Sequence, residues 1–91
     1  MNSNTNLNEK PSWFDAAIIS DKLDAREILA AGQHPLAEVI SRTSGMQSGQ
    51  IFELITPFTP MPLIEKVKAN GFSAFMLTES ESEIHTYFCK E

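Results

Sequence analysis

Apolar and polar residues follow two different periods along this chain, and the periods predict where helices and strands lie. Across residues 35–46, apolar side chains recur every three or four positions, which is typical of an amphipathic helix. A second stripe of this kind begins after Pro60 and predicts another helix, with its buried face at Leu63, Ile64 and Val67. Three other segments are apolar, β-branched or alternating and predict strands, namely residues 50–56, 72–78 and 84–90. We expect the first of these strands to be largely buried on one face.

Turn and capping residues mark where these elements begin and end. Pro35 and Pro60 suit the first position of a helix, where the missing N–H of proline costs nothing. Thr59 is placed to cap the second helix, and Asn70-Gly71 supplies a left-handed cap at its end. The acidic residues 79–83 predict the turn of an antiparallel hairpin.

The start of the chain has a different composition. Residues 1–12 are rich in Asn and Ser and predict a disordered leader. Trp13 and Phe14 interrupt this polar stretch, and they leave two alternatives, a hydrophobic anchor or a loosely docked tail. A first strand is predicted within residues 16–26, followed by one helical turn at residues 27–32.

The resulting order of elements predicts the fold class. Strand, helix, strand, helix, strand, strand (β-α-β-α-β-β) is typical of an α+β two-layer sandwich, with a mixed sheet of about four strands and two helices on one face. A chain of 91 residues makes one domain at most, which we assign to residues 13–91. Because an open sheet has two free edges, we expect a monomer or a weak homodimer.

Charge and cysteine content narrow the choice of partners and compartment. Seven basic and twelve acidic residues give a net charge of −5, which argues against nucleic acid and against anionic membrane surfaces. No apolar run reaches the roughly 18–20 residues needed to span a bilayer, and the first ten residues lack a signal core. The single cysteine, Cys89, excludes an intramolecular disulfide, so we expect a cytoplasmic protein.

The candidate binding residues gather around the start of the first long helix. His34 and Pro35 would stand at the exposed mouth of that helix, with His34 at or beside the N-cap. Two readings of His34 remain open, a cap that satisfies local backbone donors and a group that contacts a ligand. Asp24 and Arg26 would lie close by, either forming a polar pocket with His34 or joined in a salt bridge that fixes the loop.

Other side chains complete the set of candidates. Phe58 and Met61 lie in a Pro-rich loop and, if exposed, would form an apolar patch near the helix mouths. His85 and Cys89 are four residues apart on one strand face, about 13 Å on an ideal strand, too far to share a metal ion. We therefore expect no metal site, no cofactor and no catalytic residue in this chain.

The chain resembles the TusA/SirA-like, sulfur-carrier-like superfamily. The matching segments, in order, are Leu23–Arg26, His34-Pro35-Leu36, Gly49–Leu54, Pro60, Pro62-Leu63 and Gly71-Phe72. The resemblance is to an uncharacterised branch, a domain-of-unknown-function family with His-Pro where sulfur carriers have Cys-Pro, and it implies a TusA-like fold. In the wider superfamily, sulfur carriage depends on that cysteine, so the histidine at position 34 does not carry the activity over.

Two functional hypotheses follow. The first is a non-enzymatic binding or accessory module that uses the His34-Pro35 helix mouth, with Asp24, Arg26, Phe58 and Met61, to contact another protein or a small ligand. The second is a sulfur-transfer or redox carrier that acts with a partner, through Cys89 or through a cysteine of that partner.

Overall fold

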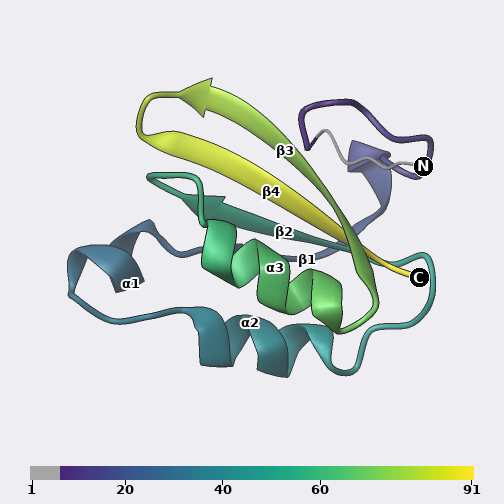
Figure 1. The fold of residues 1–91 in the computed structure, drawn as a ribbon, viewed down its shortest axis with the longest axis horizontal. Helices are drawn as coiled ribbons and strands as arrows, with labels where there is room; N and C mark the ends of the chain where they lie inside the picture. Colours follow the sequence, from purple (N-terminus) through teal and green to yellow (C-terminus); the bar gives the residue numbers. More distant parts are fainter. Residues whose placement is uncertain (1–6) are drawn as a thin grey trace.

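Strands and helices follow one another in the order that the periodicities predict. The computed structural model describes residues 7–91, and within this part the chain forms four strands and three α-helices (Figure 1). They are β1 (Ile19–Asp24), α1 (Arg26–Ala30), α2 (Leu36–Thr43), β2 (Ile51–Thr56), α3 (Met61–Ala69), β3 (Phe72–Ser80) and β4 (Glu83–Lys90), with a 3-10 turn at Ala16–Ile18 before them.

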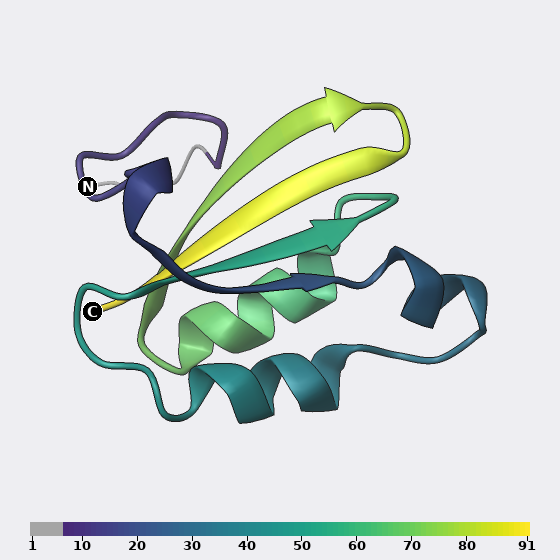
Figure 2. The same cartoon turned by 180° about the vertical axis from the view of Figure 1, so that it is seen from behind.

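The strands form one mixed sheet, which confirms the predicted α+β architecture. Their order across the sheet is β1-β2-β4-β3, with β1 parallel to β2 and the other two pairs antiparallel. The parallel pair needs a crossover connection, which α1 and α2 supply. Figures 1 and 2, seen from opposite sides, show α2 and α3 together on one face of the sheet. No helix in residues 7–91 is long and apolar enough to cross a membrane.

The main hydrophobic core lies between the sheet and these two helices. Alternate residues of each strand point towards the helices, because successive side chains of a strand face opposite sides. The buried members of this core are Leu23, Ala25, Val39, Phe52, Leu54, Leu63, Ile64, Val67, Phe72, Met76, Ile84 and Phe88. The predicted stripe of the second helix is therefore the stripe that it buries.

The N-terminal segment covers part of the opposite face of the sheet. Phe14 packs edge-on against Phe75 and Tyr87, with ring centroids 4.9 and 4.7 Å away, and Trp13 packs against the same cluster. Of the two alternatives for Trp13 and Phe14, the structure shows the hydrophobic anchor rather than a loosely docked tail. Residues 1–6 of the predicted leader lie outside the described part, whereas the carbonyl of Leu7 accepts a hydrogen bond from the amide of Met76 on edge strand β3.

Three predicted details differ in the structure. Strand β2 is buried on both faces rather than on one, because Trp13 and Phe14 pack on the cluster that contains Ile51, and His85 and Tyr87 bond to Glu53. The hairpin turn is shorter than residues 79–83, since β3 extends to Ser80 and β4 begins at Glu83. Helix α2 ends at Thr43, three residues before Met46, and the hydroxyl of Thr43 donates to the Val39 carbonyl in its last turn.

Both long helices also begin one residue later than predicted. Pro35 is the N-cap of α2, because its carbonyl accepts the first intrahelical bond, from Val39. His34 therefore lies before the cap, and its side chain caps no backbone donor. Pro60, not Thr59, is the N-cap of α3, again without a side-chain cap. At the other end of α3, Gly71 has a φ of +91°, as the predicted left-handed termination requires.

The N-terminal anchor yields a first prediction. Phe14→Ala removes two aromatic contacts over the sheet, so we expect the free energy of unfolding to fall by about 2 kcal/mol. The matched control is Ile18→Ala, which truncates a side chain that is 52% exposed in the same segment and should change stability by less than about 0.5 kcal/mol. Urea denaturation of both variants measures the difference, and equal effects would contradict the anchor.

Candidate functional site

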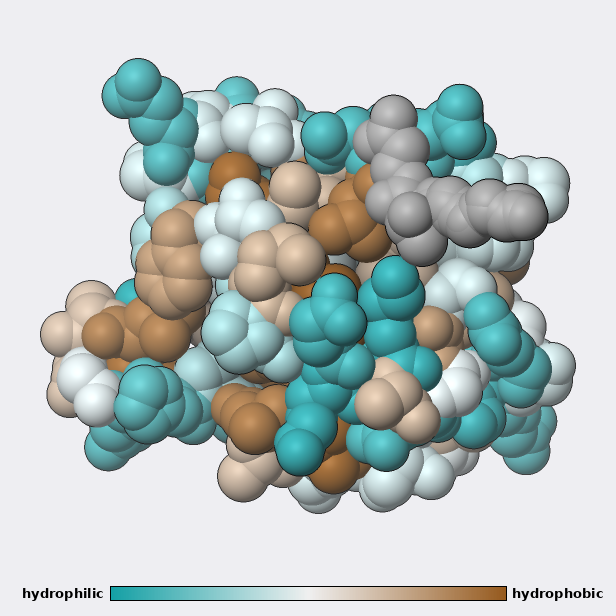
Figure 3. Space-filling view, viewed as in Figure 1, coloured by the Kyte–Doolittle hydropathy of each residue, from teal (hydrophilic) through white to brown (hydrophobic). Residues whose placement is uncertain are grey.

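An apolar groove opens where α1, the start of α2 and the β2–α3 connection meet. Its volume is about 570 Å³, and we call it the helix-mouth groove. The residues that line it are Leu29, His34, Pro35, Leu36, Thr56, Phe58, Pro60, Pro62, Leu63 and Lys66. Figure 3 shows apolar side chains gathered on this side of the molecule, over α1 and towards the start of α3. The groove thus contains three of the predicted site residues, His34, Pro35 and Phe58.

The connection between β2 and α3 positions the aromatic wall of the groove. Thr56 is fully buried at the end of β2, and its hydroxyl donates a 2.6 Å hydrogen bond to the carbonyl of Phe58. This bond folds the chain back within two residues, and the neighbouring prolines restrict it further. Phe58 is 50% exposed and lines the groove, whereas Met61 is 41% exposed and does not. Both side chains are therefore exposed, which is the condition that the predicted apolar patch depended on. Of the two, only Phe58 lines the groove.

Two side chains that line the groove have nitrogen atoms able to form hydrogen bonds. His34 and Lys66 are both solvent-exposed, and neither has a hydrogen bond or ion pair with any residue in the described range 7–91. No acidic residue of that range lines the groove. The result is an apolar wall with uncompensated hydrogen-bond donors at its edge. Lys66 is not among the residues predicted from the sequence, although it follows Leu63 by three positions and so shares its helix face.

Asp24 and Arg26 lie outside the groove, bound to each other. The guanidinium of Arg26 donates to both carboxylate oxygens of Asp24, from Nε at 2.9 Å and from Nη2 at 2.7 Å, and its Nη1 lies 3.4 Å from Glu83. Of the two alternatives for Asp24 and Arg26, the structure shows the salt bridge that fixes the loop. The bond to Arg26 lowers the pKa of Asp24 below its usual value. A polar pocket of Asp24, Arg26 and His34 does not form.

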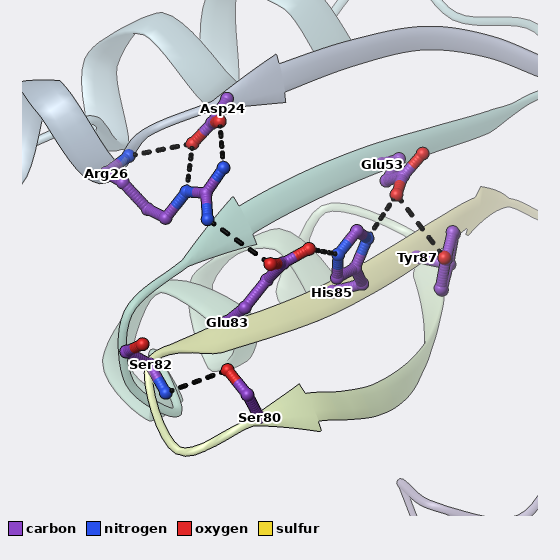
Figure 4. Close-up of polar contacts among 8 residues, drawn as sticks. All are labelled: Asp24, Arg26, Glu53, Ser80, Ser82, Glu83, His85 and Tyr87. Carbon is purple, nitrogen blue, oxygen red and sulfur yellow. Dashed lines mark hydrogen bonds and ion pairs between the residues drawn. The ribbon is translucent and has the colours of Figure 1, made fainter.

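Arg26 extends into a larger polar chain across the sheet (Figure 4). Glu83 continues it to His85, whose Nε2 lies 2.7 Å from the Glu83 carboxylate. Nδ1 of the same ring lies 2.5 Å from Glu53, and the hydroxyl of Tyr87 donates to Glu53 at 3.3 Å. We call this set, from Asp24 to Tyr87, the carboxylate–histidine chain. It ties the end of β1 to β4 and β2.

The imidazole of His85 is held between two carboxylates, and its pKa reflects them. Partial burial lowers the pKa of His85, but its hydrogen bonds to Glu83 and Glu53 and the charges of these carboxylates together outweigh burial and raise the pKa above the usual value. The bond to His85 also lowers the pKa of Glu83. Burial beside Glu53 raises the pKa of Tyr87 to about 12. The protonated ring, with both nitrogens donating, is therefore the form that this arrangement favours.

Cys89 stands on the sheet face that points away from α2 and α3. It is buried against Ile51, Phe75 and Tyr87, and burial raises the pKa of its thiol. Within residues 7–91, no group of three His, Cys, Asp or Glu side chains is arranged to hold a metal ion. The chemistry that the described residues offer at the groove is therefore apolar burial and hydrogen-bond donation.

The comparison with known families places the chain in one of them. Residues 22–90 match the family described as "Uncharacterized conserved protein (DUF2249)", so the chain belongs to this family. The match begins in β1 and ends in β4, and therefore includes the whole helix-mouth groove. No curated protein and no solved structure matches the chain.

The carboxylate–histidine chain yields a second prediction. A raised native pKa of His85 contributes stability that is complete below the unfolded value of about 6.5 and is lost as pH rises through the higher native value. Because their pKa values are lowered, Asp24 and Glu83 stabilise the folded protein at neutral pH. This contribution to the free energy of unfolding is lost as the pH falls below about 4. We therefore expect the free energy of unfolding to fall on the alkaline side of pH 6.5.

Substitution of His85 tests whether the fall in stability above pH 6.5 comes from its imidazole ring. His85→Gln should remove the alkaline slope and, at pH 6, cost about 3 kcal/mol, because Glu53 keeps only 8% of its side chain exposed and loses its charged partner. Glu81→Gln, at the exposed hairpin turn, is the matched control and should keep the slope. Urea denaturation across the pH range measures both, and a slope that persists in His85→Gln would assign the titration to another group.

Proposed function

We propose that this protein is a non-enzymatic binding module that holds the apolar part of a ligand in the helix-mouth groove. The observation that carries the proposal is the groove itself, about 570 Å³ of space with walls of Leu, Pro and Phe side chains. Sites for small molecules are typically about 300–1,000 Å³, mostly apolar, with a few polar groups that fix orientation. Thr56, His34 and Lys66 are the polar side chains that the groove presents.

The walls of the groove are held in place by the fold, which supports this role. Leu63 belongs to the buried core, and Leu29 and Leu36 pack against it. Pro35 and Pro60 are buried N-caps, and Thr56 holds the connection that carries Phe58. A ligand would therefore meet a surface that is already ordered, and little binding energy would be lost to ordering it.

The alternative, a sulfur-transfer or redox carrier, has less support. Carriage by the chain itself requires an accessible thiolate, because the thiolate is the nucleophile. Cys89 is buried, its pKa is raised, and it lies on the sheet face opposite the helices. At the helix mouth the chain presents His34, which cannot form a persulfide.

We extend the proposal to the superfamily relationship of the chain and to its cellular compartment. The order of strands and long helices, together with His34-Pro35 at the start of α2, supports a distant relationship with the TusA/SirA-like superfamily. The single cysteine supports a cytoplasmic location, where thiols stay reduced. In this view, the chain is a small cytoplasmic member in which the position of the carrier cysteine serves ligand binding.

A third prediction tests the groove directly. The neutral fluorescent probe N-phenyl-1-naphthylamine should bind the protein and brighten, because its environment becomes apolar. Phe58→Ala removes the aromatic wall and should weaken probe binding about tenfold. Because Phe58 is half-exposed, this variant should keep its stability, which urea denaturation verifies.

Two controls define the site. Met61→Ala truncates an exposed side chain that does not line the groove, and Ile18→Ala truncates one in the N-terminal segment. Both should bind the probe as the unmodified chain does. A probe that does not brighten, or that binds equally well to Phe58→Ala, would refute the proposed function, and an effect of Met61→Ala as large as that of Phe58→Ala would move the site to the outer surface.

A further inference from the structure

We infer that the ligand of the helix-mouth groove is an amphipathic monocarboxylate, an apolar body with a single carboxylate that binds Lys66 and His34. The inference rests on the proposed function, because it names the ligand of the same groove. Three observations carry it: the unpaired charge of Lys66, the ring nitrogens of His34 that bond to no described residue, and the absence of an acidic side chain among the described residues that line the groove.

Lys66 is the one lysine or arginine among the described residues that line the groove. The chain has a net charge of −5, and both of its arginines already bind carboxylates. Like the other lysines, Lys66 forms no ion pair with a carboxylate among residues 7–91. Because Lys66 lines an apolar groove, a ligand that fills the groove would remove water from its side chain. Removal of water from an unpaired charge is costly, and a carboxylate on the ligand offsets that cost.

His34 adds a second contact for the same group. Its side chain lines the groove and donates to no described residue, since α2 begins with Pro35 and needs no cap from it. A carboxylate has two oxygens and can accept from an ammonium and an imidazole N–H together. Neither α2 nor α3 has a side-chain cap, so the positive ends of both helices add to the attraction for an anion.

The composition of the groove favours a carboxylate over other charged groups. A cationic ligand would find no carboxylate among the described residues that line it. A phosphate would carry up to two charges, and its preferred partner is the bidentate guanidinium, yet Arg26 and Arg42 are both bound to carboxylates elsewhere. One lysine and one histidine match one carboxylate. The apolar walls account for the rest of the ligand.

Three probes with the same apolar chain test the assignment by isothermal titration calorimetry. They are decanoate, decanol and decyltrimethylammonium, each used below the concentration at which it aggregates. We expect decanoate to bind at least tenfold more tightly than decanol, and decyltrimethylammonium to bind most weakly. Raised salt should weaken decanoate and leave decanol unchanged, because only the former binds through charge.

Two lysine variants locate the carboxylate. Lys66→Gln should weaken decanoate about tenfold and leave decanol unchanged, since it removes a charge and keeps an apolar stem. Lys68→Gln is the matched control, because Lys68 lies on the same helix but does not line the groove. His34→Ala should weaken decanoate by a smaller factor. An effect of Lys68→Gln as large as that of Lys66→Gln would overturn the placement of the carboxylate.

The possible failures can be told apart. Equal binding of decanoate and decanol would refute the carboxylate and leave the binding function in place. Tighter binding of decyltrimethylammonium would reverse the charge that we assign to the ligand. If none of the three binds but a capped, uncharged leucine-rich peptide does, the groove is a protein-docking surface and the inference is wrong. If nothing binds, the proposed function fails together with the inference.

Discussion

The burial of strand β2 on both faces is the constraint on which the rest of this structure depends. All six of its residues are buried, so each side chain must be apolar or have a polar partner. Helices α2 and α3 cover one face, and the N-terminal aromatic residues cover part of the other. Glu53 is the one charged residue of the strand, and His85 and Tyr87 supply its partners. A small domain with so little interior has few other ways to stabilise a central strand.

The end of the same strand creates the groove. Thr56 is the last residue of β2, and its bond to the carbonyl of Phe58 turns the chain directly into the start of α3. Because α2 begins beside this turn, two helix starts and one aromatic side chain surround a single apolar space. His34 and Pro35 line this space, where we propose that the ligand binds. The carboxylate–histidine chain and the groove have no residue in common.

Local patterns in the sequence were sufficient to predict the elements and their order. The spacing of Val39, Ile40 and Thr43 predicts α2, and Asn70-Gly71 predicts the end of α3, because these signals depend on neighbours a few residues apart. The position of His34-Pro35 at an exposed helix mouth and the exposure of Phe58 could also be inferred from the sequence. The helix starts were misplaced by one residue, because a proline fits both the N-cap and the first helical position.

What the sequence did not predict depends on contacts between distant segments. Glu53 and His85 meet only because β2 pairs with β4 in the register that sets Ile55 opposite His85, and a register cannot be derived from either strand alone. Likewise, the cluster that buries Ile51 of β2 includes Phe14, far away in the sequence. Lys66 lies on the helix face of Leu63, yet its place at the groove becomes visible only when α2 is packed beside α3.

The most direct test of the central claim is a backbone NMR titration of the isotope-labelled protein with decanoate. The account predicts chemical-shift changes confined to the residues of the helix-mouth groove, with the largest at Leu36, Phe58 and Lys66. The amides of Trp13 and Cys89, on the opposite face of the sheet, should not move. Shifts centred on that opposite face, or no shifts at all, would contradict the claim that the helix-mouth groove is the binding site.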